Sequence, residues 1–296
     1  MKKKIIVFGG SGFLGSHVAD ELSNQGFAVT IFDTKSSKWL KKNQKFIKGD
    51  ILDVRSLEKA IKGSSSIFNF ASISDIGESL QNPLETAKIN IIGLIEMLKL
   101  CVKYKIKQYV HASTVYVSGD HGGFYKSSKL ASESYVQEFY KIYGLKYAIL
   151  RYGTLYGPRS DQNNGLHQII KNAILKKRME YLGDVDATRD YINVIDAAKA
   201  STKALSKNFQ NKIVIISGPE TIKVKDILQI ISEIMSFKKT IKYTKRDKVK
   251  LHAHYIRTPY TIKEPLIMKF NENFHIDIGQ GLSNLIKELQ TIYKKK

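Results

Sequence analysis

The sequence predicts an α/β protein with a doubly wound parallel sheet and a smaller C-terminal α/β subdomain. Three observations favour this fold class. Short continuous apolar runs alternate with longer amphipathic stretches in the first half, a glycine-rich turn follows the first apolar run, and the alternation loosens after about Tyr152. Strands that are buried on both faces read as continuous apolar runs, and the helices between them act as crossovers in a parallel sheet.

Strands and helices are expected to alternate along most of this first half. The apolar run Ile5–Phe8 starts the sheet, and Gly26 ends the helix that follows it. The stretch 83–104 has apolar residues at helical spacing, among them Ile95 and Leu98. Strands are expected at 5–8, 28–32, 46–47, 67–70, 109–112 and 147–150. Helices are expected at 13–24, 56–61, 83–104 and 125–143.

After this region, glycine, proline and asparagine residues mark loops, and the expected elements are fewer. One further strand is expected at 213–216, and helices at 166–176, 224–235 and 282–293. The length allows one large domain or two closely joined ones. We expect a first domain of residues 1–155 plus about 189–216, and a second of about 156–188 plus 217–296.

The composition indicates a globular protein with a basic surface. The formal net charge is +21, and 43% of the residues are hydrophobic. Most basic residues are lysines spread along the chain, whereas specific nucleic-acid binding favours arginine on a localised face. We therefore expect a solvated lysine-rich surface and no nucleic-acid partner. Weak attraction of anionic substrates is the alternative.

No segment is expected to enter a membrane. The basic start Met1–Lys4 precedes an apolar run that is too short for a signal peptide. No stretch approaches the roughly 20 apolar residues that cross a bilayer. The single cysteine, Cys101, cannot form an internal disulfide, which fits a reducing compartment. We expect a cytoplasmic protein without a membrane partner.

The turn after the first strand has the pattern of a phosphate-binding loop. Its glycines suit a tight turn, close backbone approach to a pyrophosphate and close helix packing, and the N-terminus of the next helix attracts phosphate. The residues expected to hold a dinucleotide here are Gly9, Gly12, Phe13, Leu14 and Gly15. Asp33, at the end of the second strand, would bind an adenosine ribose and repel a 2′-phosphate. The sequence thus predicts a Rossmann site for NAD, although Lys35 and Lys38 leave NADP open.

Tyr125 and Lys129 lie four residues apart on an expected helix, so their side chains project from one face. A free phenol has a pKa near 10. A neighbouring ammonium and an oxidised nicotinamide favour the phenolate and make it a usable base. Ser113 and Thr114 lie at the C-terminal end of a strand, where ligands bind in such sheets. We expect Tyr125 to be the acid/base, with Lys129 beside it and Thr114 bonded to the same substrate oxygen.

In this order and spacing, these residues resemble the extended short-chain dehydrogenase/reductase family, in its nucleotide-sugar epimerase/dehydratase branch. Five more segments extend the resemblance over nearly the whole chain: Gly49–Ile51, Asn69–Ser72, Asn90–Gly93, Arg151–Arg159 and Arg189–Asp196. The resemblance implies that the cofactor site also includes Asp50, Ile51, Phe70, Ala71, Ser72, Asn90, Tyr125 and Lys129. It implies substrate-binding residues at Ser113, Thr154, Arg159 and Arg189.

The resemblance also implies the partners. The second domain is expected to bind a nucleotide-diphosphate sugar, which Arg189 holds by its diphosphate. A homodimer is expected through the helices 83–104 and 125–143. Their apolar residues could equally face the sheet alone.

Three departures from the family pattern bear on the reaction. The loop between Thr114 and Tyr125 is short, and Thr154 replaces an asparagine common in epimerases. Val115 and Tyr116 stand where the 4,6-dehydratases have an Asp-Glu pair, so dehydration is disfavoured. We expect an NAD-dependent epimerase of a UDP-type sugar nucleotide that works at C4. A keto-sugar-nucleotide reductase or dehydrogenase is the enzymatic alternative, and a dinucleotide-sensing binding protein is the non-enzymatic one.

The remaining candidate side chains are expected to be structural. His252 and His254 are two apart, but no further ligand stands at suitable spacing, so no metal is expected. His111 and His167 are expected to be satisfied structural or loop histidines, and Cys101 to lie in the core.

Overall fold

A computed structural model describes residues 2–119, 121–237, 241–244, 267–270 and 275–294. The chain divides into two compact units. Unit 1 comprises the described residues up to 152, together with 198–216 and 267–270. Unit 2 comprises the described residues of 153–197 and those that follow 216, apart from 267–270.

The described residues of unit 1 form an eight-stranded sheet in which every pair is parallel. Its strands are β1 (Lys4–Phe8), β2 (Ala28–Asp33), β3 (Lys45–Lys48), β4 (Ser66–Asn69), β5 (Gln108–Thr114), β6 (Tyr147–Tyr152), β10 (Lys212–Ile216) and β13 (Ile267–Lys269). Their order is β13-β10-β6-β5-β4-β1-β2-β3, which confirms the predicted doubly wound sheet. The order reverses between β1 and β4, where such sheets bind ligands at the carboxyl ends of the strands.

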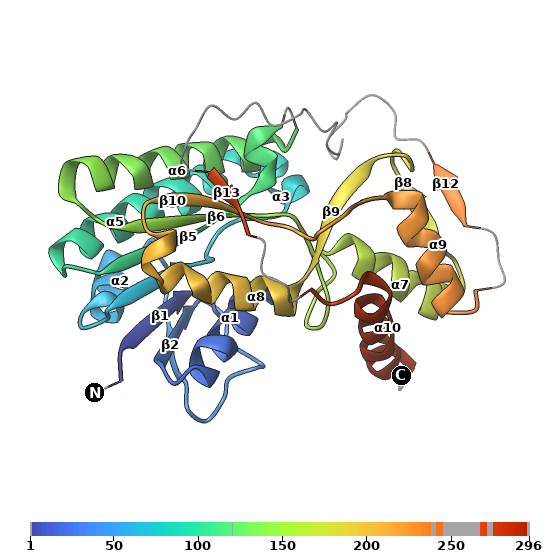
Figure 1. The fold of residues 1–296 in the computed structure, drawn as a ribbon, viewed down its shortest axis with the longest axis horizontal. Helices are drawn as coiled ribbons and strands as arrows, with labels where there is room; N and C mark the ends of the chain where they lie inside the picture. The colour runs from blue at the N-terminus through green and yellow to red at the C-terminus, as the bar shows by residue number, and fades with distance from the viewer. Residues whose placement is uncertain (1, 120, 238–240, 245–266, 271–274, 295–296) are drawn as a thin grey trace. The chain divides into compact units, whose positions relative to one another are not determined.

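Helices cover both faces of this sheet (Figure 1). Those of unit 1 are α1 (Phe13–Asn24), α2 (Val54–Ile61), α3 (Ile76–Gln81), α4 (Pro83–Ala87), the π-helix η1 (Lys88–Gly93), α5 (Leu94–Lys103), the 3-10 helix η2 (Val115–Ser118) and α6 (Gly123–Tyr143). One core cluster packs Leu57 of α2, Met97 of α5 and Val136 of α6 against Ile6 and Tyr109 of the sheet. These three helices therefore share a face, and α1 packs on the other, next to β1 and β2.

The expected helix 83–104 is three consecutive segments in the structure, α4, η1 and α5. Within the π-helical turn, the backbone carbonyl of Asn90 accepts a 2.7 Å hydrogen bond from the hydroxyl of Ser132 on α6. The apolar periodicity did not reveal this change of helix type, because the apolar spacing alone does not distinguish one π-helical turn within a longer helix.

Unit 2 has a core of helices and short strands. Its strands are β7 (Thr154–Tyr156), β8 (Glu180–Leu182), β9 (Thr188–Asn193), β11 (Thr221–Lys223) and β12 (Lys242–Thr244). Its helices are α7 (Gly165–Lys176), α9 (Val224–Ile234) and α10 (Ile278–Lys294). Ile170, Leu228 and Leu285 pack these three helices together.

The units meet along the chain at α8 (Val194–Thr202), which the 3-10 helices η3 (Lys203–Leu205) and η4 (Lys207–Phe209) follow. Residues 189–197, grouped with the first domain in the sequence analysis, pack within unit 2. The reason is that β9 pairs with β7 and β11. The described part of the chain contains no helix long and apolar enough to cross a membrane.

Candidate active site

The glycine turn lies at the carboxyl end of β1 and is packed too tightly for side chains. Gly9 has a φ of +70°, and a Cβ there would lie 2.6 Å from the backbone nitrogen of Ala71. A Cβ on Gly15 would overlap the carbonyl oxygen of Gly9. Gly12 is the N-cap of α1 and brings no side chain to the helix start. The first N–H groups of α1 are thus open to an anionic ligand.

Asp33 joins the glycine turn to the end of β2. One carboxylate oxygen accepts a 3.0 Å hydrogen bond from the backbone N–H of Ser11, and the other accepts a 3.0 Å hydrogen bond from the backbone N–H of Lys35. The carboxylate is half-buried and faces the turn. Phe13 is half-buried and Leu14 is buried on the first turn of α1.

Two further predicted segments lie at the same edge of the sheet. Phe70, Ala71 and Ser72 follow β4, and the backbone of Phe70 and Ala71 packs directly on Gly9. Asp50 and Ile51 follow β3. The carboxylate of Asp50 accepts a hydrogen bond from the backbone N–H of Leu52, and Ile51 is buried. The four strand ends from β1 to β4 therefore bring together all the predicted dinucleotide-binding segments outside the helices.

Asn90 acts as a clamp inside the protein. Its side-chain oxygen accepts a 2.8 Å hydrogen bond from the backbone N–H of Ile73, and its nitrogen donates to the carbonyl of Ile73 and to the hydroxyl of Ser128. Asn90 is 3% exposed. The structure therefore places it between the segment after β4 and helix α6, where it orients both.

Tyr125 and Thr114 lie together at the carboxyl end of β5. Burial raises the pKa of the Tyr125 phenol above its usual range, a hydrogen bond with Thr114 lowers it in part, and Tyr116 adds to the rise. Without a further positive charge, Tyr125 is therefore a neutral phenol at physiological pH.

Lys129 is buried beside Tyr125, one helical turn further along α6. Its ammonium lies 5.9 Å from the centroid of the Tyr125 ring and donates a 2.9 Å hydrogen bond to the carbonyl of Ala112. Burial lowers the pKa of Lys129 to about 8, and the negative charge of Glu133 acts in the opposite direction. The ammonium contacts the strand end rather than the phenolic oxygen.

A buried ion pair lies next to this site and was not predicted from the sequence. Glu133 accepts hydrogen bonds of 3.0 and 2.6 Å from Nε and Nη2 of Arg151, and one of 2.5 Å from the hydroxyl of Ser113. The hydroxyl of Ser113, which was expected to bind substrate, therefore donates its hydrogen bond to Glu133. The available signal was the spacing, since Glu133 follows Tyr125 and Lys129 at successive turns of one helix face.

The remaining predicted substrate residues belong to unit 2. Thr154 is in β7, where it pairs with Tyr191 of β9. Arg189 is in β9, and its guanidinium donates a 3.3 Å hydrogen bond to the hydroxyl of Tyr181. Arg159 has a φ of 64°, and its backbone N–H donates to Glu288 of α10.

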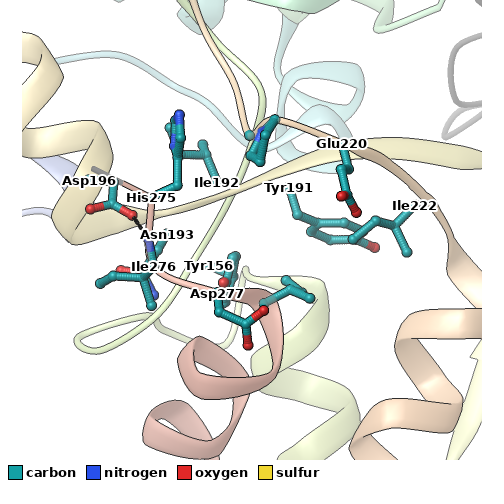
Figure 2. A pocket seen from close by; sticks show the side chains of 13 residues that line it. Tyr156, Tyr191, Ile192, Asn193, Asp196, Glu220, Ile222, His275, Ile276 and Asp277 are labelled. Carbon is teal, nitrogen blue, oxygen red and sulfur yellow. Dashed lines mark hydrogen bonds between the residues drawn. The ribbon is translucent and has the colours of Figure 1, made fainter. Parts of the chain in front are cut away.

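Unit 2 also contains a pocket that none of the predicted residues lines. Figure 2 shows the carboxylates of Asp196, Glu220 and Asp277 around it, together with Tyr191 and His275. A carboxylate oxygen of Asp196 accepts a hydrogen bond from the backbone N–H of Ile276, which also lines the pocket. The negative charge of the pocket's three carboxylates does not suit a diphosphate.

The two described histidines of interest differ. His167 has both ring nitrogens hydrogen-bonded, at 3.2 Å to Ser160 and 3.1 Å to Tyr293. His111 is buried, and neither ring nitrogen has a hydrogen-bond partner among the described residues. Within the described ranges, no group of three or more His, Cys, Asp or Glu could hold a metal. His252 and His254 lie outside the described residues.

Comparison with known proteins identifies the family of the chain. A sequence model of the NAD dependent epimerase/dehydratase family matches residues 5–217. A putative UDP-glucose 4-epimerase of Methanocaldococcus jannaschii is 31% identical over 304 residues, which cover 95% of this chain and 97% of the relative.

Solved structures are similar to this chain over nearly its whole length. A UDP-glucose 4-epimerase from Thermotoga maritima, in complex with UDP-glucose, has a TM-score of 0.84 at 25% identity, over 98% of this chain and 99% of the other. A UDP-N-acetylglucosamine 4-epimerase from Methanobrevibacter ruminantium, in complex with UDP-N-acetylmuramic acid, has a TM-score of 0.82 at 26% identity, over 99% and 100%. The chain belongs to the NAD dependent epimerase/dehydratase family.

Proposed function

We propose that this protein is an NAD-dependent nucleotide-sugar epimerase that inverts C4 of a UDP-linked sugar. The observation that carries the proposal is the closeness of Tyr125 to Thr114 at the end of β5, with the Lys129 ammonium 5.9 Å from the Tyr125 ring. The pair lies at the carboxyl end of β5, in the unit that holds the glycine turn. The relatives of matching length named as UDP-sugar 4-epimerases support the choice of reaction.

The residues at the edge of the sheet fit NAD. Glycines at positions 9 and 15 keep the turn tight, because a Cβ at either position would overlap the backbone of neighbouring residues, and a tight turn before a helix N-terminus suits a pyrophosphate. The Asp33 carboxylate suits a ribose diol and repels a 2′-phosphate. Asp50 and Ile51 would line the adenine, and Phe70, Ala71 and Ser72 the ribose and phosphates. When bound, NAD supplies a reversible hydride acceptor and a positive charge.

Tyr125 is the proposed acid/base. Its oxygen removes the proton of the sugar 4-hydroxyl and later returns it to the same oxygen. Thr114 donates a hydrogen bond to that oxygen and holds it within reach. Lys129 holds the nicotinamide ribose and, by its charge, favours the phenolate of Tyr125.

The substrate is proposed to be a nucleotide-diphosphate sugar. Arg189 suits the diphosphate because a guanidinium offers two parallel donors, and its bond to Tyr181 would be exchanged on binding. Thr154 and Arg159 are proposed as further substrate contacts. Val115 and Tyr116 in η2 offer no carboxyl group, so the sugar is not dehydrated.

We further propose a homodimer formed through α4–α5 and α6. Phe124, Tyr135 and Ile142 are exposed at spacings of 11 and 7 residues on α6, which places them on one stripe. Leu84 and Ile92 are exposed on the neighbouring helical segments. Light scattering should give twice the chain mass, and Tyr135→Lys with Ile142→Lys should give a monomer. The thiol Cys101 is buried and unpaired, which suits a cytoplasmic enzyme.

The test is conversion of UDP-glucose, UDP-N-acetylglucosamine and UDP-glucuronic acid by purified protein, with products separated by chromatography. An epimer at C4 without accumulation of reduced cofactor supports the proposal. Stoichiometric reduced cofactor would identify a dehydrogenase instead, and NAD binding without conversion of any of the three would contradict the proposed substrate class. Tyr125→Phe should lower turnover by roughly 10²–10⁴-fold, the usual contribution of general acid–base catalysis, and leave NAD affinity nearly unchanged.

A further inference from the structure

The ion pair beside the active site joins three elements of unit 1. Glu133 is on α6, Arg151 is on β6, and Ser113 is on β5 in direct register with Arg151. Both members of the ion pair are buried, with side chains 9% and 3% exposed. A third guanidinium nitrogen, Nη1, donates a 3.3 Å hydrogen bond to Ser118 at the end of η2. The network thus attaches α6 to the two strands whose ends form the site.

The same helix face holds the groups that the proposed reaction needs. Tyr125, Lys129 and Glu133 are spaced by four residues, so they follow one another along the face that meets β5. Lys129 donates to the carbonyl of Ala112, and Glu133 binds the side chain of the next residue, Ser113. A displacement of α6 at Glu133 would therefore also shift Lys129 and Tyr125.

The charges around Lys129 come from three elements. On α6 it meets Tyr125 and Glu133; on β5 it faces His111, whose own pKa is lowered by burial and by the Lys129 charge. Arg151 of β6 forms an ion pair with Glu133, but of these two residues only Glu133 acts on the pKa of Lys129. The carboxylate that acts on the ammonium is thus Glu133.

We infer that Glu133 is a positioning residue, which through Ser113 and Arg151 fixes the catalytic turn of α6 on the end of β5. Its negative charge also favours the ammonium form of Lys129 on the same helix face. Ser113 then serves the helix and not the substrate. This inference rests on the proposed function for its kinetic test, but not for its spectroscopic one.

The kinetic test compares Glu133→Gln and Ser113→Ala with Glu138→Gln. Glu138 is exposed on the same helix and pairs with Lys141, so its variant should behave as the wild type. Misplacement of a catalytic group by about 1 Å can cost about a hundredfold in rate. Glu133→Gln should lower kcat by up to this factor with little change in KM, and its alkaline limb of kcat/KM should move to lower pH. Ser113→Ala should lower kcat by a smaller factor.

Glu133→Gln leaves Arg151 buried without its charge partner and can fail to fold. The double variant Glu133→Leu with Arg151→Met removes both charges together and keeps the volume, and it should fold and show the same loss of kcat. Wild-type kcat and pH profile in folded Ser113→Ala and in the double variant would overturn the inference. A raised KM with unchanged kcat in Ser113→Ala would overturn it as well, since Ser113 would then be a substrate ligand.

The second readout needs no turnover. Tyrosinate absorbance of the NAD-loaded protein is titrated, and the signal of Tyr125→Phe is subtracted to isolate Tyr125. In Glu133→Gln, or in the double variant if that protein does not fold, the Tyr125 titration should move to higher pH. The effect through Lys129, about 6 Å away, outweighs the direct effect of a carboxylate eight residues along a helix, about 12 Å away. An unmoved titration would overturn the inference even if the sugar substrate proves to be wrong.

Discussion

The side-chain nitrogen of Asn90 donates a 2.9 Å hydrogen bond to the hydroxyl oxygen of Ser128, three residues after Tyr125 on α6. The bond ties the π-helical turn to the helix that carries the proposed acid/base. Asn90 also holds both backbone groups of Ile73. One amide therefore positions the segment after β4 and the catalytic helix together.

Asn90→Ala should lower the free energy of unfolding by about 2–3 kcal/mol, because buried groups left without partners cost roughly 1–3 kcal/mol each. The melting temperature should fall by several degrees, as calorimetry or circular dichroism would measure. Asn284→Ala is the control, since Asn284 is exposed on α10 and surface changes stay within about 0.5 kcal/mol. Equal melting temperatures for the two variants would contradict the clamp.

Gly15→Ala should weaken NAD binding, because the added Cβ meets the carbonyl of Gly9 and displaces the turn. Overpacking costs roughly 1–3 kcal/mol, which corresponds to about 5- to 140-fold in the dissociation constant. Titration calorimetry with NAD measures the change. Gly165→Ala is the matched control, because no atom lies within 4 Å of the added Cβ, and its affinity should equal that of the wild type.

Asp33→Ser should narrow the preference for NAD over NADP. The substitution removes the charge that repels a 2′-phosphate, and the exposed Lys35 and Lys38 can then approach it. The dissociation constants of the two dinucleotides should converge, with NAD weaker and NADP tighter than in the wild type. Asp184→Ser is the control: Asp184 is exposed and also accepts from the backbone two residues on. A wild-type that already prefers NADP would refute the role given to Asp33.

The proposed epimerisation should fall as pH rises through about 8. Burial lowers the pKa of Lys129 to about 8, so above this pH its ammonium loses a proton. The phenolate of Tyr125 then loses a favourable neighbouring charge, and kcat/KM declines. Lys129→Arg keeps its charge over this range and should show no such decline, even if its rate is lower. A wild-type profile that is flat up to pH 10 would speak against this assignment.

Local patterns predicted the parts of the fold and site that depend on neighbours in sequence. The strands β1, β2 and β4 to β6 and the helices α1 and α6 lie where apolar periodicity placed them, since buried parallel strands and amphipathic helices differ strongly in pattern. The glycine turn was equally clear, because its backbone conformation tolerates little else.

The features that were missed depend on contacts between distant residues. β7, β8 and β11 have three residues each, too few to show a period. The ion pair of Glu133 and Arg151 joins residues 18 apart in sequence, and neither residue type reveals that it is buried. For the same reason, the hydrogen bond from the Ser113 hydroxyl to Glu133 could not be predicted from the position of Ser113 at a strand end.

The last strand of the unit 1 sheet has a consequence for biosynthesis. β13 pairs with residues 213–215 of β10, but it leaves the ribosome some fifty residues after its partner. Until then, β10 offers an open backbone edge to other nascent chains. A fragment that stops at Ile216 would keep this edge permanently, so it would tend to aggregate although it contains the whole glycine turn and the Tyr125 helix.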